Sequence, residues 1–353
     1  MHLPNSRVGL LLSGIFLFLT AILSAAAQGT VPQTPAGQQQ PAEPPPPIRP
    51  SQSAAPQGQG TAAPAPPVDD SGTFVFKKEV EEVVIHATVV DKDQHMVTNL
   101  DRTAFKVFED GKEQGVTSFR HEDIPVAMGI VIDNSGSMRE KRDKVNKAAL
   151  NLVRSSNPQD QVFVVNFNDE YFLDQDFTSD IGKLKEALEK VEARGGTALY
   201  DAIVASGDQC KNSDLQKKVL FVVTDGEDTA SRESLEQAVK RLQGENGPTI
   251  YTIGILGDEG RHKTRRVLQT ISDRTGGLAF FPKTLDEVDA ISREIAHDIR
   301  NQYTIGYKPS NPKSSGGYRA IHVEAVAKGH GKMIVRTRSG YYAGQERIAS
   351  GTP

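Results

Sequence analysis

Cysteine is almost missing from this chain. Cys210 is the only one among 353 residues, so no disulfide can form within the chain, and we assign its thiol no role. A basic excess is missing as well, since 41 Lys and Arg stand against 45 Asp and Glu. We therefore expect no nucleic-acid partner, because no broadly positive surface would neutralise its phosphates.

Signatures of common enzymes are absent too. The sequence contains no Gly-x-Ser-x-Gly elbow, no His-Glu-x-x-His pattern and no phosphate-binding loop, and its histidines show no metal-ligand spacing. We therefore predict that the protein is not an enzyme. A calcium loop beginning at Asp91-x-Asp93 is also excluded, because Met96 stands where that loop needs Gly and Arg102 where it needs Glu.

The longest apolar run lies at the N-terminus. Arg7 precedes the run Val8–Leu23, and Ala25-Ala26-Ala27 fits a cleavage site of small residues. We predict a signal peptide over residues 1–27, which places the mature chain in the periplasm or outside the cell. The alternative is an uncleaved membrane anchor, although the run is short for the roughly 20 residues that span a bilayer.

Residues 28–70 have the composition of a disordered linker rich in Pro, Gln and Ala. Twelve of the 20 prolines fall within it, including Pro44-Pro45-Pro46-Pro47. Such a segment cannot bury a hydrophobic core and favours extended polyproline II conformations. We interpret it as a spacer; a stalk or a docking ligand for a partner is the alternative.

Residues 71–123 carry the pattern of β-strands. The run Val83-Val84-Ile85 consists of β-branched residues, which favour strands. Phe105-Lys106-Val107-Phe108 alternates, as expected for a half-buried strand. Asp110-Gly111 predicts a hairpin turn, with Val116–Phe119 as the returning strand.

Residues 302–345 are strand-like again, and residues 346–353 are expected to form a loose tail. Each β segment alone has too few strands to be stable, but together they approach the strand count of an immunoglobulin-like sandwich. We predict one small all-β immunoglobulin-like sandwich, built from 71–123 and 302–345, with residues 124–301 inserted as a separate domain. The alternative is two unrelated β extensions that pack on different faces of the inserted domain.

Strands and helices alternate over residues 124–301. This alternation predicts an α/β fold with a doubly wound, mostly parallel sheet and helices on both faces. We expect Ser231 or Thr229 to cap the helix that ends at Leu242. The expected strands are 126–133, 162–167, 172–173, 219–223, 249–255 and 278–281, and the expected helices are 139–154, 181–191, 198–210, 231–242, 264–272 and 285–300.

Polar residues follow the apolar run Val126–Ile132. Asp133, Ser135 and Ser137 place one carboxylate and two hydroxyls just past the end of a buried strand, where open α/β sheets bind ligands. Two further loops carry Thr197, after a Gly-Gly pair, and Asp225. Loops that follow neighbouring parallel strands meet at one edge of the sheet, so we expect these five side chains to converge.

Three hydroxyls and two carboxylates are hard oxygen donors. They suit Mg²⁺, and Mn²⁺ or Ca²⁺ would also fit. Because only Asp133 and Asp225 bring charge, the ion would stay electrophilic and an open position would accept a carboxylate from a partner protein. The alternative is that Ser135-Gly136-Ser137 only caps the next helix and Asp225 only forms a turn, which leaves Thr197 unexplained.

The pattern Asp133-x-Ser135-x-Ser137, followed in order by Thr197 and Asp225, resembles the metal-ion-dependent adhesion site of von Willebrand factor type A domains. The resemblance covers about residues 124–300, and the chain as a whole looks like a bacterial secreted protein related to this family. It implies that the five residues bind the ion directly or through water. Three charged residues lie close to these loops and are interpreted as solvated: Asp201, Glu227 and Asp228. The alternative is that one of them supports an ion ligand without binding the ion itself.

The expected function is that of an extracytoplasmic, metal-dependent protein-binding or adhesion module, which captures an acidic residue of a partner at a Mg²⁺ ion. Two alternatives stay open: an envelope-assembly protein whose metal only stiffens the loop, and a metal-dependent hydrolase. A chelatase-like subunit conflicts with the predicted signal peptide. Membrane contact is expected only through an uncleaved signal segment, and the sequence does not indicate an oligomeric state.

Overall fold

The computed structural model describes residues 82–257 and 261–344 of the chain. The predicted signal peptide, linker and tail lie outside these residues. Within the described ranges, none of the helices combines the length and the apolar character needed to cross a membrane.

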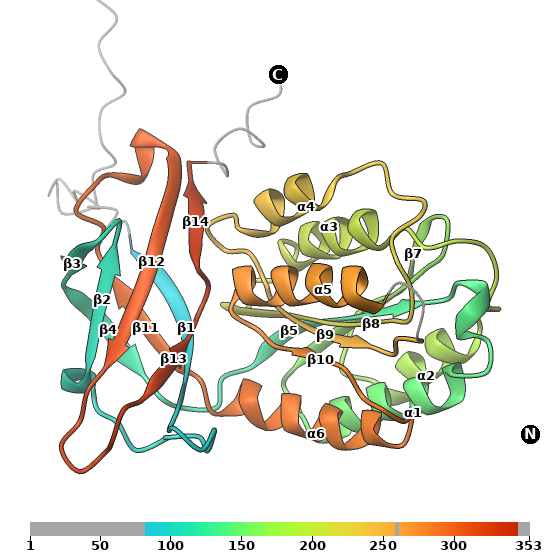
Figure 1. Ribbon diagram of the computed structural model, residues 1–353, viewed down its shortest axis with the longest axis horizontal. Helices are drawn as coiled ribbons and strands as arrows, with labels where there is room; N and C mark the ends of the chain where they lie inside the picture. The colour runs from blue at the N-terminus through green and yellow to red at the C-terminus, as the bar shows by residue number, and fades with distance from the viewer. Residues whose placement is uncertain (1–81, 258–260, 345–353) are drawn as a thin grey trace, which may run out of the picture. The chain divides into compact units, whose positions relative to one another are not determined.

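A six-stranded sheet forms the centre of the α/β part (Figure 1). Its strands are β5 (Val126–Asp133), β6 (Gln161–Phe167), β7 (Tyr171–Thr178), β8 (Lys217–Thr224), β9 (Thr249–Gly254) and β10 (Ala279–Phe280). They lie in the order β10-β9-β8-β5-β6-β7, and all neighbours are parallel except β6 and β7. The predicted α/β class with a mostly parallel sheet is therefore confirmed.

Helices cover both faces of this sheet (Figure 1). They are α1 (Arg142–Arg154), α2 (Ile181–Glu189), α3 (Leu199–Cys210), α4 (Leu235–Leu242), α5 (Arg261–Thr275) and α6 (Glu287–Arg300). Side chains of β5 alternate between the faces: Ile130 and Ile132 pack with α1, α2 and α6, whereas Val131 packs with α3, α4 and α5. Burial on both faces explains why β5 is an uninterrupted apolar run.

Several element boundaries differ from those expected. Helix α4 begins later than predicted, and its cap is Ser234, which exchanges hydrogen bonds with Gln237 in a capping box; the prediction of Ser231 or Thr229 is wrong. Strand β7 spans eight residues, where only Phe172-Leu173 was expected. Helix α1 begins at Arg142 because residues Gly136–Met138 form a separate 3-10 turn.

The β segments form two antiparallel sheets. One has the order β13-β1-β11-β4 and the other β14-β12-β2-β3. The strands of the first segment are β1 (Val83–Val90), β2 (Phe105–Glu109), β3 (Lys112–Gln114) and β4 (Val116–Arg120); those of the second are β11 (Tyr303–Tyr307), β12 (Gly317–Ala325), β13 (Ile334–Arg336) and β14 (Gly340–Ala343).

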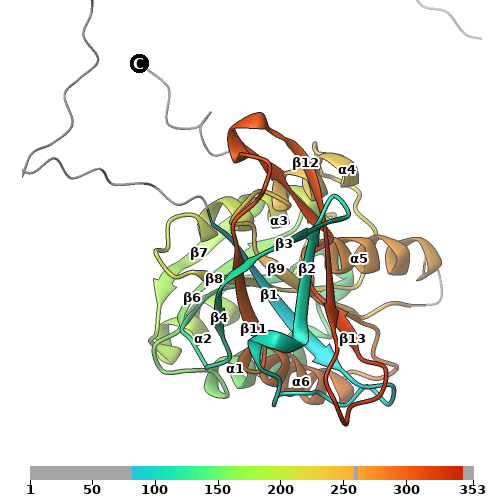
Figure 2. The same cartoon turned by 90° about the vertical axis from the view of Figure 1, so that its left-hand side faces the viewer.

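Each of these sheets combines strands of both segments. β11 pairs with β1 and β4, and β12 pairs with β2, so strands about 200 residues apart in the sequence lie side by side (Figure 2). Apolar side chains of the two sheets form one cluster. The immunoglobulin-like arrangement and the domain boundaries remain predictions.

The Asp110-Gly111 turn is present, with positive φ at both residues, but its returning strand is β3. The prediction that Val116–Phe119 returns is wrong, because β4 crosses to the other sheet and pairs with β11. A two-residue turn joins immediately adjacent strands, and Lys112–Gln114 follows it without a gap.

A chain truncated after Asn301 is expected to lose ordered structure between residues 82 and 122. Strands β1, β2 and β4 would lose their partners β11 and β12, and strands without partners are marginal in water. Limited proteolysis followed by mass spectrometry should show rapid cleavage within this segment in the truncated chain and slow cleavage in the full one. Equal protection in both chains would contradict a shared β core.

Candidate functional site

Asp133 ends β5 at the carboxyl edge of the sheet, between β6 and β8. Its side chain is fully buried. Oδ1 accepts a hydrogen bond from the Ser135 backbone N–H at 2.7 Å, and Oδ2 accepts one from the Thr224 hydroxyl at 2.6 Å. These two contacts hold the carboxylate in one orientation.

The two serines connect this loop with the loop after β8. The Ser135 and Ser137 hydroxyl oxygens are 3.2 Å apart, and the Ser137 hydroxyl donates to Asp225 Oδ1 at 2.8 Å. The side chain of Asp225 is only 1% exposed, so it is shielded from solvent although it lies in the loop that follows β8. The structure thus brings Asp133, Ser135, Ser137 and Asp225 together, as expected from the sequence.

Thr197 approaches from a third loop. Its backbone N–H donates to the Thr229 hydroxyl at 3.0 Å, and its carbonyl accepts from the Thr229 N–H at 2.8 Å. The Thr197 hydroxyl oxygen lies 3.6 Å from the position that a Cβ on Gly226 would take. All five predicted residues therefore belong to three loops that meet at one edge of the sheet.

Gly195 explains the paired glycines before Thr197. Its φ of 75° lies in the left-handed region, and a Cβ there would come within 2.1 Å of an Asp169 carboxylate oxygen. The loop is also held by two hydrogen bonds: the Gly136 N–H donates to the Gly195 carbonyl, and the Gly196 N–H donates to Asp169 Oδ1 at 2.8 Å. Glycine at position 195 therefore lets the loop pass close to Gly136 and Asp169.

The electrostatics of the site favour a cation. Burial raises the pKa of Asp133, and the negative charge of Asp225 raises it further. The ammonium of Lys141 contacts Asp225 Oδ2. The two carboxylates and three hydroxyls offer only oxygen atoms as ligands, which is the preference of Mg²⁺, Mn²⁺ and Ca²⁺. A divalent ion would also offset the repulsion between the two carboxylates.

Sequence reasoning missed the residues that support the site. Thr224 orients Asp133, Thr229 holds Thr197, and Lys141 pairs with Asp225. The sequence signal for Thr224 is its position, because its hydroxyl stands directly before Asp225. Lys141 gave no signal, because its pairing spans 84 positions of the chain.

Asp201 and Asp228, interpreted from the sequence as solvated charges, are half-buried and also accept hydrogen bonds within the protein. Asp201 accepts hydrogen bonds from the backbone N–H groups of Arg232 and Glu233, and Asp228 accepts from the Tyr200 N–H at 3.0 Å. Both carboxylates fasten the segment before α4 to the start of α3. They act through backbone geometry, which spacing in the sequence does not reveal.

Asp91, Asp93 and His95 form a separate cluster, with potential ligand atoms within 4.8 Å of one another. The latter two side chains are largely exposed, and Asp93 pairs with Lys92 at 2.7 Å. We assign no site there.

Comparison with known proteins bears on the α/β part. Residues 128–227 match the family described as von Willebrand factor type A domain. Calcium-activated chloride channel regulator 3A-1 of Mus musculus is 33% identical over 177 residues, which is 46% of this chain and 18% of that protein. The match thus spans less than a fifth of the relative's length.

Two solved structures are similar at low sequence identity. The von Willebrand factor domain of the type V pili tip protein Mfa5 from Porphyromonas gingivalis is 14% identical, with a TM-score of 0.44 over 50% of this chain and 95% of that one. The von Willebrand factor type A protein from Catenulispora acidiphila is 14% identical, with a TM-score of 0.44 over 78% of each chain.

Proposed function

We propose that this chain binds another protein through a divalent cation, because residues 128–227 match the family described as von Willebrand factor type A domain, whose members are typically adhesion or protein-interaction modules. The ion is Mg²⁺, with Mn²⁺ or Ca²⁺ as substitutes. Its ligands, direct or through water, are Asp133, Ser135, Ser137, Thr197 and Asp225. The partner contributes an acidic side chain.

The observation that carries this proposal is the convergence of two buried carboxylates with three hydroxyls. Asp133 is fully buried and Asp225 nearly so, and burial of two like charges in one site is unfavourable unless a cation compensates them. Lys141 supplies one positive charge beside Asp225. A divalent ion held by only two charged ligands would stay electrophilic and would accept a further carboxylate at an open position.

The proposal gives this chain no catalytic role. A hydrolase would need a general base within hydrogen-bond reach of a metal-bound water. The hydroxyls of Ser135, Ser137 and Thr197 are weak bases, and the two carboxylates are the charged ligands of the ion. The predicted signal peptide places the module in the periplasm or outside the cell, where such a surface meets other envelope or secreted proteins.

Metal-controlled capture tests the function. The mature chain, immobilised and mixed with an extracytoplasmic extract of its native host, is expected to retain a partner in Mg²⁺, to release at least about 90% of it in EDTA and to bind it again when Mg²⁺ is restored, because the partner carboxylate coordinates the ion. Mass spectrometry of the released protein provides the measurement.

Asp225→Asn should abolish this capture, whereas Asp214→Asn, a change at an exposed carboxylate before β8, should not. Metal binding by the wild type without any Mg²⁺-dependent capture would favour the alternative of a metal that only stiffens the loop.

A further inference from the structure

Strand β7 exposes three consecutive large apolar side chains. Tyr171 is 50% exposed, Phe172 44% and Leu173 48%, and they make up half of the six large apolar residues that are exposed within the described part of the chain. Among the residues that the structure describes, β7 lies at the end of the six-stranded sheet and pairs with β6 alone (Figure 1). The outer edge of β7 therefore offers unpaired backbone N–H and C=O groups next to exposed apolar side chains.

Edge strands of soluble proteins are normally protected by charged side chains, above all lysine, or by proline, a bulge or short length. Residues 168–181 contain no Lys, Arg or Pro, but they contain five carboxylates. The register irregularities of β7 lie toward its end, opposite Val162–Val165. Tyr171–Leu173 pairs regularly with Phe167–Val165, so these three residues form a regular stretch of strand edge with no charged side chain of their own.

Tyr171 also borders an acidic groove. It pairs with Phe167, and Leu173 pairs with Val165; both partners pack on the α3 side of the sheet. On that side lies a cavity of about 510 Å³ between β7, α3 and the segment that leads into α4. Its charged lining consists of five carboxylates and two guanidiniums: Asp169, Glu170, Asp201, Asp208, Glu233, Arg232 and Arg241.

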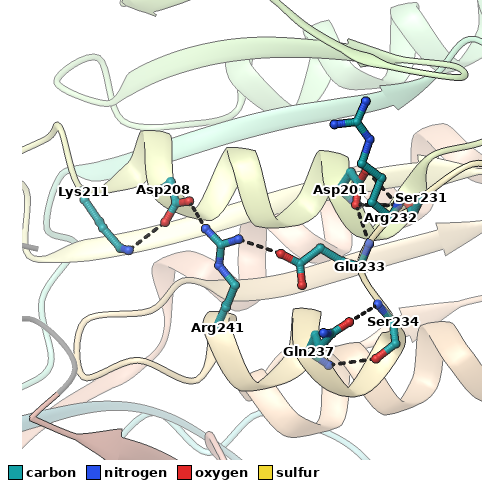
Figure 3. A network of polar contacts seen from close by, with 9 residues as sticks. All are labelled: Asp201, Asp208, Lys211, Ser231, Arg232, Glu233, Ser234, Gln237 and Arg241. Carbon is teal, nitrogen blue, oxygen red and sulfur yellow. Dashed lines mark hydrogen bonds and ion pairs between the residues drawn. The ribbon is translucent and has the colours of Figure 1, made fainter. Parts of the chain in front are cut away.

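One of the two guanidiniums is already compensated. Arg241 pairs with Asp208 at 2.6 Å and with Glu233 at 2.7 Å, and Asp201 receives backbone N–H groups instead of a cation (Figure 3). Asp208 also pairs with Lys211 at 2.7 Å, but the five carboxylates still outnumber the three cations, and Glu170 contributes to this excess of negative charge beside Tyr171. A ligand that complements it carries positive charge.

We propose that the β7 edge binds an extended basic segment of a partner protein. The segment adds as a further strand beside Tyr171–Leu173 and places Lys or Arg side chains in the acidic groove. Main-chain hydrogen bonds then supply affinity, and alternate side chains supply specificity. A second copy of this chain is a poor occupant, because two acidic β7 strands would repel each other. The site uses none of the five proposed metal ligands.

A fluorescent peptide of about eight residues that alternates Val and Lys is the probe, with the alternating Val and Glu peptide as its control. The mature chain is titrated in EDTA, so that failure of the metal-dependent function leaves this test unaffected. The Lys peptide should bind, more weakly at high salt, and hydrogen exchange should show new protection of amides at Tyr171–Leu173. The Glu peptide should not bind.

Leu173→Lys is expected to weaken binding of the Lys peptide about tenfold or more, because it puts a solvated cation on the strand edge. Val326→Lys, a matched change at a residue that is 73% exposed away from β7, should leave binding unchanged. Should Leu173→Lys fail to fold, Glu170→Gln is the second variant and should weaken binding about threefold.

Equal binding by Leu173→Lys and Val326→Lys, protection confined to other strands, or no binding of the Lys peptide would overturn the proposal. A dimer that forms through β7 in the absence of peptide would also overturn it, because the occupant would then be a second copy.

Discussion

Replacing Asp133 with alanine is expected to weaken Mg²⁺ and Mn²⁺ binding about 100-fold or more. The change removes one of the only two charged groups among the proposed ligands, and the serine and threonine hydroxyls that remain are neutral. Isothermal titration calorimetry of wild type and variant provides the measurement. One binding site is expected in the wild type, and equal affinities in the two proteins would contradict the proposed metal site.

The variant should remain folded. Burial raises the pKa of Asp133, which means that folding destabilises its ionised form relative to its protonated form. Above that pKa, removing the carboxylate in the absence of metal removes an unfavourable charge, although the Thr224 hydroxyl and the Ser135 backbone N–H lose their acceptor. Thermal unfolding without metal should therefore differ little from wild type, and Asp214→Ala, at an exposed carboxylate, should change neither stability nor metal affinity.

Replacing Arg319 with alanine is expected to lower the free energy of unfolding by about 3–5 kcal/mol. Arg319 and Glu109 form an ion pair at 3.1 Å, and both side chains are only 2% exposed. Glu109 also accepts hydrogen bonds from the hydroxyls of Tyr307 at 2.7 Å and Tyr341 at 3.0 Å. Without Arg319, a buried carboxylate would lose its only cationic partner among these contacts.

This cluster joins β2 of the first segment to β11, β12 and β14 of the second. Burial raises the pKa of Tyr307 and Tyr341, and Glu109 raises both further, so the two phenols stay protonated and continue to donate. Arg319 also donates to the backbone carbonyls of Asn311 and Pro312, which orders the loop before β12. We therefore expect the lost stability to affect the β part as a whole.

Denaturant unfolding measures this loss, with Arg293→Ala as the control. Arg293 pairs with Asp289 on the exposed side of α6, and such surface pairs contribute less than about 1 kcal/mol. Similar losses in the two variants would show that the Glu109–Arg319 pair does not hold the β segments together.

The α/β class and the five candidate residues could be predicted from sequence because their signals are local. Apolar runs such as Val126–Ile132 mark strands that are buried on both faces, and the polar residues that follow them mark the carboxyl edge of the sheet. Strand and helix periods are properties of a few consecutive residues, so alternating elements were visible without any long-range information.

Other features were decided only by the tertiary structure. The choice of β3 rather than β4 as the returning strand, the pairing of Lys141 with Asp225 and the burial of Glu109 against Arg319, 210 positions away, all depend on which distant segments meet. The exposure of Tyr171–Leu173 is of the same kind, because it depends on which segments pack nearby. Sequence patterns report which face of an element is apolar, whereas packing determines what covers that face and which charges come to lie together.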